Sequence, residues 1–174
     1  MLARFKAWRR RRRAATASAE EIARSLLVEW LGRTDRAVLS DICAEHGRDE
    51  SPLAPVFSMY EFACVYLVLG SRAEQSPLLG EALGHFTAAI QSQMSDRLAA
   101  ETLGYHIQDA GRRLASLLEG AGRDKPLGWA RESLRDDFEI DETDPASLTM
   151  WASYWMDYYV HLSRACEDIR RAHE

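Results

Sequence analysis

Residues 145–173 read PASLTMWASYWMDYYVHLSRACEDIRRAH, and this stretch decides the fold class. Asp144 followed by Pro145 is typical of a helix start, because aspartate accepts hydrogen bonds from free N–H groups and proline fits the first turn. Apolar side chains then recur at alternating spacings of three and four positions, which predicts one long helix with a continuous seam facing a partner. The members of this seam are Leu148, Trp151, Trp155, Tyr158, Leu162, Ala165, Ile169 and Ala172.

The rest of the chain divides into shorter helical segments. Ser18 stands three positions before Glu21, which is the capping-box spacing, and Ser76-Pro77 and Pro126 indicate further helix starts. No convincing alternating strand and no hairpin turn is visible. We therefore predict an all-α fold, an antiparallel bundle of five to seven helices with a disordered basic N-terminal tail. The tail covers residues 1–17, and a single domain covers 18–174. The short helix that opens at Pro126 carries Leu127, Ala130, Leu134 and Phe138, and the acidic segment 136–144 is expected to form a loop after it.

The core is expected to form from the seams of two helices. Besides the helix of residues 145–173, a second seam runs from Ala100 to Leu117 and ends before Gly120. Large apolar side chains at seam positions are those most often buried. The residues predicted to be buried are Leu103, Ile107, Leu114, Trp151, Trp155, Tyr158 and Leu162.

Segment 53–69, LAPVFSMYEFACVYLVL, is the most apolar, and Glu61 is its only charged residue. Its length favours a buried helix that begins near Pro55 over a strand without a partner. A membrane span would need about 20 apolar residues and would tolerate a carboxylate poorly, so we do not favour one. Glu61 is a candidate site residue, because functional sites collect buried carboxylates. It could equally face solvent, pair with an arginine of another helix, or complete a cap with Ser58.

Length and composition exclude several classes of protein. The chain has 174 residues, of which 47% are hydrophobic and 28% are charged. A chain of this size can hold a core without disulfides or metal, and the balance excludes a wholly disordered or collagen-like protein. Cys43, Cys64 and Cys166 are far apart without CxxC spacing, which favours buried thiols in a reducing compartment. No apolar stretch follows the basic start as in a secretory signal, so a cytoplasmic location is expected.

Charge is segregated along the sequence. Residues 1–13, MLARFKAWRRRRR, hold seven basic side chains and no acid. The remaining residues hold fifteen basic against 27 acidic side chains, a net charge of −12. A block of like charges stays solvated and is typical of an interaction tail. Tail and acidic segment could attract each other within one chain or between two.

The tail combines an apolar helical face with a basic block. This combination suits an anionic membrane surface, where the protein would be peripheral. RNA, DNA or an acidic protein are competing partners, and nucleic acid is not favoured, because two aromatic residues lie on the apolar face. An Arg-rich, acid-free start is also typical of mitochondrial targeting, which stays open. The predicted binding residues are Leu2, Phe5, Trp8, Arg9, Arg10, Arg11, Arg12 and Arg13.

No complete catalytic, nucleotide-binding or zinc motif is present, and we predict no cofactor and no metal. The alternative to an interaction module is an enzyme or metal-binding bundle. It would use Glu61 together with three acid–histidine pairs, each of which lies on one face of its own helix. This alternative requires the pairs to converge, which spacing alone does not establish. The pairs are Glu81 with His85, His106 with Asp109, and Asp157 with His161.

A homodimer is a further expectation. The seam of the helix at 145–173 is longer than the short helices of one chain are expected to cover. A second copy would bury the remainder, and two-fold dimers are the commonest closed assembly.

Overall fold

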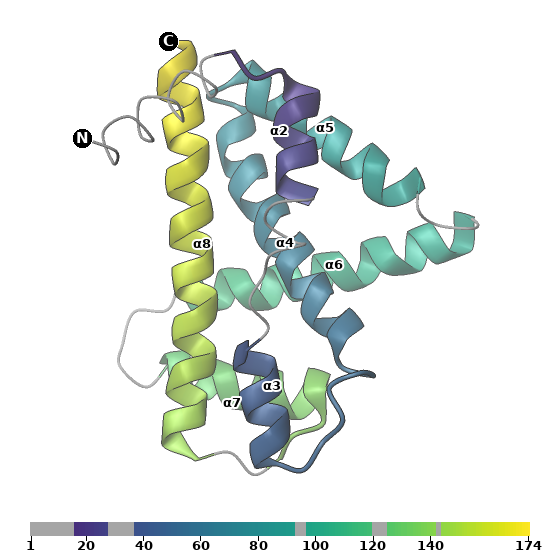
Figure 1. Cartoon of the computed structure of the whole chain (residues 1–174), viewed down its shortest axis with the longest axis vertical. Coiled ribbons are helices and arrows are strands. Elements are labelled where there is room, and N and C mark those ends of the chain that lie inside the picture. Colours follow the sequence, from purple (N-terminus) through teal and green to yellow (C-terminus); the bar gives the residue numbers. More distant parts are fainter. Residues whose placement is uncertain (1–15, 28–36, 93–96, 120–124, 142–143) are drawn as a thin grey trace.

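The computed structural model describes residues 16–27, 37–92, 97–119, 125–141 and 144–174, with the backbone alone for 97–101. The described part is built of seven helices without a strand, which confirms the all-α prediction (Figure 1). The helices are α2 (Ala19–Ser25), α3 (Ala37–Glu45), α4 (Ala54–Ala73), α5 (Pro77–Ser92), α6 (Arg97–Leu118), α7 (Lys125–Phe138) and α8 (Pro145–His173). The tail residues singled out above, Leu2, Phe5, Trp8 and Arg9–Arg13, lie outside the described residues.

Two helix starts are capped as their sequences predict. The Ser18 hydroxyl accepts a hydrogen bond from the Glu21 N–H (3.2 Å), and the Ser18 N–H donates to Glu21 Oε2 (2.8 Å). At the start of α8, Asp144 Oδ1 accepts hydrogen bonds from the N–H groups of Ala146 (2.6 Å) and Ser147 (3.3 Å). These contacts satisfy backbone donors that have no partner inside the helix.

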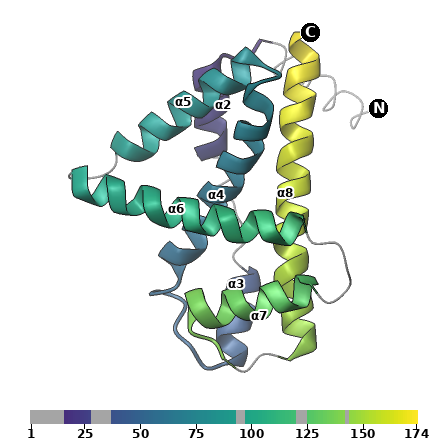
Figure 2. The ribbon, with the colours of Figure 1, turned by 180° about the vertical axis from the view of Figure 1, so that it is seen from behind.

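The helices do not form a uniformly antiparallel bundle. Helices α4 and α8 pack together along the long axis and run in the same direction, whereas α6 crosses α4 (Figures 1 and 2). The antiparallel prediction is wrong for the central pair, because it assumed short connections between packed neighbours. Three helices intervene between α4 and α8, so no short loop sets their relative direction.

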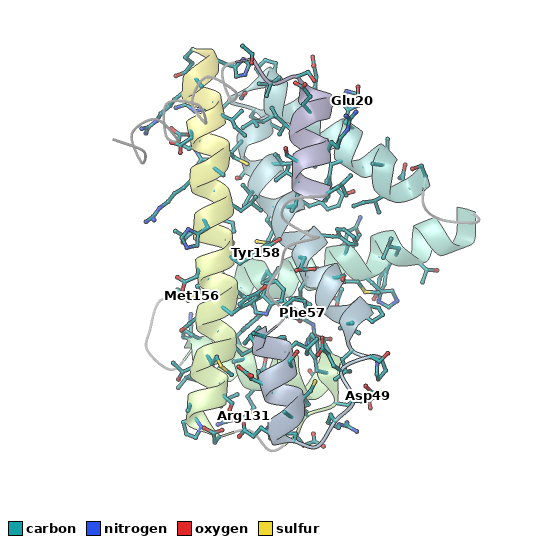
Figure 3. The ribbon with its side chains drawn as sticks, viewed as in Figure 1. Glu20, Asp49, Phe57, Arg131, Met156 and Tyr158 are labelled. Atoms are coloured by element: carbon teal, nitrogen blue, oxygen red, sulfur yellow. The ribbon has the colours of Figure 1, made fainter. Side chains whose placement is uncertain are left out.

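Helix α4 is at the centre of the core, where it packs against α5, α6 and α8. An aromatic cluster fills the space between α4 and α8. Trp155 lies with its ring centre 5.0 Å from that of Phe57 and 5.3 Å from that of Tyr60, and Trp151 lies 5.9 Å from Phe57. Figure 3 shows Phe57 and Tyr158 directed into the molecule, with Met156 on the outer side of α8.

Six of the seven residues predicted to be buried are buried, and the exception is Leu103. Leu103 is only partly buried, because α6 extends past the helices that it crosses. In the last turns of α8 the seam departs from the predicted positions. Cys166 is buried there, whereas Ala165 and Ile169, which belong to the predicted seam, are only partly buried. Most of the α8 seam is thus covered within one chain, and the homodimer stays a prediction.

By length and composition, α4 is the one described helix that could cross a membrane. The same test is passed by core helices of globular proteins, and α4 packs here against α5, α6 and α8. Its carboxylate, Glu61, is 1% exposed.

The acidic segment 136–144 begins inside a helix rather than as a loop. Asp136, Asp137 and Phe138 form the end of α7, because Leu134 and Phe138 lie one turn apart and are both fully buried. The helix ends at Glu139, whose φ of 54° is left-handed, and the Ile140 N–H then donates to the Leu134 carbonyl (2.9 Å). Core packing of Phe138 therefore extends the helix through the two aspartates.

Candidate functional site

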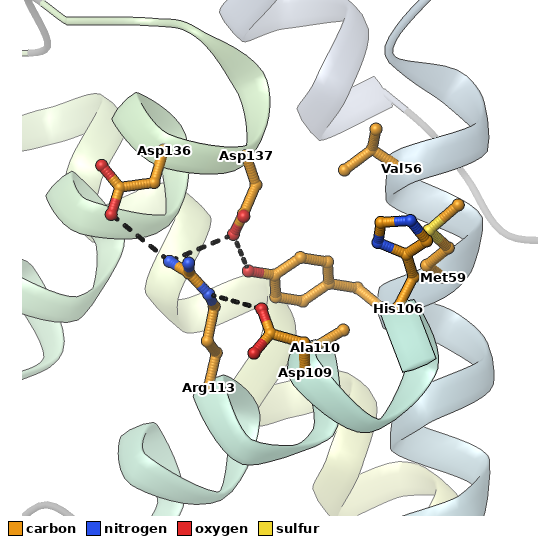
Figure 4. A pocket seen from close by; sticks show the side chains of 9 residues that line it. Val56, Met59, His106, Asp109, Ala110, Arg113, Asp136 and Asp137 are labelled. Carbon is orange, nitrogen blue, oxygen red and sulfur yellow. Dashed lines mark hydrogen bonds and ion pairs between the residues drawn. The ribbon is translucent and has the colours of Figure 1, made fainter. Parts of the chain in front are cut away.

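A cavity of about 230 Å³ opens between α4, α6 and α7 (Figure 4). One part of its wall is apolar, formed by Val56 and Met59 of α4 and Ala110 of α6. The other part carries groups that bind by hydrogen bonds or charge. These are Tyr60, His106, Asp109, Arg113, Asp136 and Asp137.

Helical spacing brings these side chains to one place. On α6, His106, Asp109 and Arg113 follow one another at three and four positions and therefore share a face. The last turn of α7 supplies Asp136 and Asp137, because burial of Phe138 carries the helix that far. The Trp129 indole N–H donates to the Arg113 carbonyl (2.7 Å), which joins α7 to α6 beside the cavity.

Arg113 is at the centre of the polar wall. Its Nη1 lies 3.5 Å from Asp136 Oδ2 and 3.5 Å from Asp137 Oδ2, and its Nε lies 3.4 Å from Asp109 Oδ2. Burial alone would lower the pKa of Arg113, but Asp137 and the other neighbouring anionic groups raise it. The guanidinium therefore stays charged and holds three carboxylates from two helices around the cavity.

A chain of hydrogen bonds connects the pocket with the core. The Trp151 indole N–H donates to Ser133 Oγ (3.3 Å), and the Ser133 hydroxyl donates to the Tyr60 oxygen (3.1 Å). Tyr60 in turn donates to Asp137 Oδ2. Each hydroxyl thus accepts one hydrogen bond and donates another, so these buried polar groups are all partnered.

The two aspartates of α7 differ in their electrostatics. Burial raises the pKa of Asp137 above its ordinary value, although the Tyr60 hydrogen bond and Arg113 oppose this. The hydrogen bond from Arg135 lowers the pKa of the more exposed Asp136. Burial, followed by the hydrogen bond to Asp137, raises the pKa of Tyr60. Asp137 is therefore an anion held in a site that disfavours it, which is common where ligands bind.

No protein-family model, no curated protein and no solved structure matches this chain. The residues themselves must therefore indicate what the pocket can do. Its carboxylates already bind the guanidinium of Arg113, and Asp109 and Asp136 also contact the more exposed Arg112 and Arg135. Carboxylate oxygens can accept more than one hydrogen bond. The arrangement favours a cationic group with an apolar stem over an anion, because the one cation of the wall, Arg113, is already engaged.

One of the three predicted acid–histidine pairs lines the pocket. His106 and Asp109 lie on its wall, but Glu81 and His85 are exposed on α5, and Asp157 and His161 are exposed on α8. Within the described ranges, no three His, Cys, Asp or Glu side chains come together so as to hold a metal ion.

Glu61 is buried in α4 and does not line the pocket. The alternatives that Glu61 faces solvent or completes a cap with Ser58 are wrong, because the carboxylate is buried and Ser58 lies inside α4. All three cysteines are buried, as predicted, and burial raises the pKa of Cys166 to about 11.

Among the polar residues of the site, the sequence gives no prediction for Tyr60 and Arg113, and Asp136 and Asp137 enter only as part of the acidic segment 136–144. The spacing of Asp109 and Arg113 could have indicated their ion pair, because residues four apart are neighbours on a helix. The role of Tyr60 had no local signal, because its partner lies 77 positions further along the chain.

Proposed function

We propose that the protein is a non-enzymatic interaction module that docks reversibly on an anionic membrane surface through its basic tail, residues 1–13. The tail offers Leu2, Phe5 and Trp8 for insertion and seven basic side chains for the head groups. Each basic residue near such a surface contributes about 1 kcal/mol, so seven of them are enough for reversible attachment. In the folded part of the chain, the observation that supports this proposal is the difference in charge between its two ends.

The two ends of the molecule differ in charge. The acidic end comprises α3 with the turn to residue 53, α7 with its continuation to residue 141, and Asp144 (Figure 1). It carries ten carboxylates and four basic side chains. The tail end comprises residues 16–25, 70–76 and 164–174, with six carboxylates and five basic side chains. In Figure 3, Glu20 marks the tail end, and Asp49 and Arg131 mark the acidic end.

This polarity orients the protein on a surface. The tail joins the folded part directly before α2, which begins at the end of the molecule where α8 ends (Figure 1). The 29 residues of α8 extend over about 43 Å at the rise of an α-helix, and this helix spans both ends. The Debye length at physiological salt is only about 8 Å, so a membrane at the tail end would hardly feel the acidic end. Docking through the tail therefore avoids the repulsion that the acidic body would otherwise cause.

Vesicle co-sedimentation tests the proposal with the full chain. Wild-type protein should bind vesicles that contain phosphatidylserine and should not bind pure phosphatidylcholine. Replacement of Arg9–Arg13 by glutamine should abolish binding, because five of the seven tail charges are lost. Replacement of Phe5 and Trp8 by alanine should weaken it by removing the inserted side chains.

The matched control makes the same change of charge with the four basic side chains of the acidic end and Arg112 of α6. Arg48, Arg112, Lys125, Arg131 and Arg135 are all exposed, and their replacement by glutamine also removes five positive charges. This variant should bind anionic vesicles as the wild type does. Equal loss in both variants would show that only net charge matters and would contradict the proposal. RNA binding through the tail without vesicle binding would assign the tail to nucleic acid instead.

A further inference from the structure

We propose that the pocket between α4, α6 and α7 binds an arginine side chain from the tail of a second copy of this chain, so that copies associate head to tail. The proposal shares its binding segment, residues 9–13, with the proposed function, but it needs no membrane. It rests on the size and chemistry of the pocket, on the charge of the acidic end, and on the reach of the tail.

The size of the cavity fits one side chain rather than a large ligand. Its volume of about 230 Å³ lies below the ~300 Å³ at which pockets for drug-sized ligands begin. Val56, Met59 and Ala110 form a surface on which the methylene stem of an arginine can lie. The carboxylates opposite can accept hydrogen bonds from its guanidinium, which carries five donors in a planar fork.

The wall already shows the chemistry that such a ligand would use. Arg113 is held there by carboxylates of Asp109, Asp136 and Asp137. Among the described contacts of Asp137, the Tyr60 hydrogen bond and the Arg113 ion pair both use Oδ2, which leaves Oδ1 to accept from a ligand.

Two further arginines approach this wall from outside. Arg112 and Arg135 contact Asp109 and Asp136, and their side chains are 70% and 52% exposed. Solvent screens such exposed pairs. Asp136 and Asp137 of the pocket belong to the acidic end, whose ten carboxylates exceed its four basic side chains. This excess of negative charge attracts a cation over a longer distance than a single hydrogen bond or ion pair does.

The tail of the same chain reaches this pocket poorly. Arg13 lies three residues before Thr16, at most about 11 Å of extended chain, and Arg9 lies seven residues before it, at most about 25 Å. Along α4, the thirteen residues from Tyr60 to Ala73, at the opposite end from the pocket, correspond to about 20 Å. Because α2 begins at that opposite end, only the first arginines of the run reach the pocket of their own chain, and only with the tail fully extended, so the run as a block does not (Figure 1). A second copy has no such restriction.

Sedimentation velocity of the full chain at low ionic strength tests the inference. Wild-type protein should associate with rising concentration, and high salt should reverse the association. The tail variant, with Arg9–Arg13 replaced by glutamine, and the pocket variant, Asp136→Asn with Asp137→Asn, should each be monomeric. Each loses one half of the contact, and association should be about tenfold to a hundredfold weaker, as expected for lost hydrogen bonds to charged groups.

Mixing the two variants is the decisive step. The tail variant keeps an intact pocket and the pocket variant keeps an intact tail, so an equimolar mixture should form a one-to-one complex that does not grow further. Agmatine, an alkylguanidinium, should compete with this complex. As a matched control, Asp41→Asn with Asp49→Asn removes two exposed carboxylates of the acidic end outside the pocket and should leave association unchanged.

Three results would overturn the inference: a wild-type protein that stays monomeric, a mixture that fails to associate, or a control variant that loses association as the pocket variant does. Asp136→Asn alone repeats the test at an exposed residue, where folding is not at risk. The pocket variant should still bind anionic vesicles, because its tail is intact. Failure of vesicle binding with intact association would therefore contradict only the proposed function.

Discussion

Tyr60, in the first half of α4, donates its hydroxyl hydrogen to Asp137, in the last turn of α7. The phenol ring is 2% exposed, so its polar tip needs a partner, and the aspartate offers an acceptor at the edge of the pocket. This contact couples the central helix of the core to the segment that carries the candidate site. It also places a carboxylate where burial raises its pKa.

Loss of the tyrosine hydroxyl should therefore cost more than loss of the aspartate charge. Tyr60→Phe leaves the carboxylate without its buried donor and Ser133 without its acceptor, and we expect a loss of about 1–3 kcal/mol in the free energy of unfolding. Asp137→Asn keeps an acceptor for Tyr60 and removes a charge that burial disfavours, so its cost should be smaller. Urea unfolding of both variants at neutral pH gives the comparison. A larger loss for Asp137→Asn would show that its ion pair with Arg113 outweighs the cost of burying the charge.

The aromatic cluster between α4 and α8 should dominate stability. Trp155→Ala removes a fully buried ring that contacts Phe57, Tyr60 and Trp151, and we expect a loss of about 3–5 kcal/mol. Met156→Ala, at the next position on the same helix, truncates a side chain that is 41% exposed and should change stability little. Thermal unfolding monitored by circular dichroism separates the two. Similar melting temperatures for both variants would mean that the seam of α8 faces elsewhere.

The capping box of α2 should contribute measurably despite the short helix. Ser18→Ala removes the acceptor for the Glu21 N–H and should lower the free energy of unfolding by about 1 kcal/mol. Ser25→Ala, at the other end of α2, alters an exposed serine and serves as the control. If both substitutions have the same effect in urea unfolding, the cap makes no special contribution.

Acid should weaken the link between α4 and α8 at Glu167. Hydrogen bonds from Arg170 and then Arg171 lower the pKa of this carboxyl to about 2, and Arg72 of α4 lies 3.2 Å from it. A carboxyl whose pKa is lower in the folded state stabilises the fold above its unfolded pKa, and this contribution is lost as pH falls. Wild type should therefore exceed Glu167→Gln in stability at neutral pH, and the difference should shrink from about pH 4.5 towards pH 2.

Urea unfolding at several pH values measures that difference. Asp168→Asn, which removes an exposed carboxylate from the same turn, is the control for a simple change of charge. A gap between wild type and Glu167→Gln that stays constant with pH would contradict the role of the ion pairs.

Features set by neighbouring residues could be predicted from the sequence, whereas features set by tertiary packing could not. The caps at Ser18 and Asp144 involve residues within three positions, so their contacts follow from the order of residues alone. The convergence of Glu81, His106 and Asp157 could not be judged in the same way, because spacing shows which residues share a face but not which faces meet. At the end of α7 the apolar spacing predicts a helix as far as Phe138, whereas the carboxylates of 136–144 favour a loop, and burial of Phe138 decides the conformation.

The pairing of α4 with α8 has a consequence during synthesis on the ribosome. Arg72 and Glu167 contact each other across 95 positions of sequence, and the aromatic cluster likewise joins the first half of α4 to α8. Translation adds about 5–20 residues per second, so the apolar face of α4 waits several seconds for its partner helix. During that interval the nascent chain exposes its most apolar segment, which makes it a substrate for chaperones that bind unfolded chains.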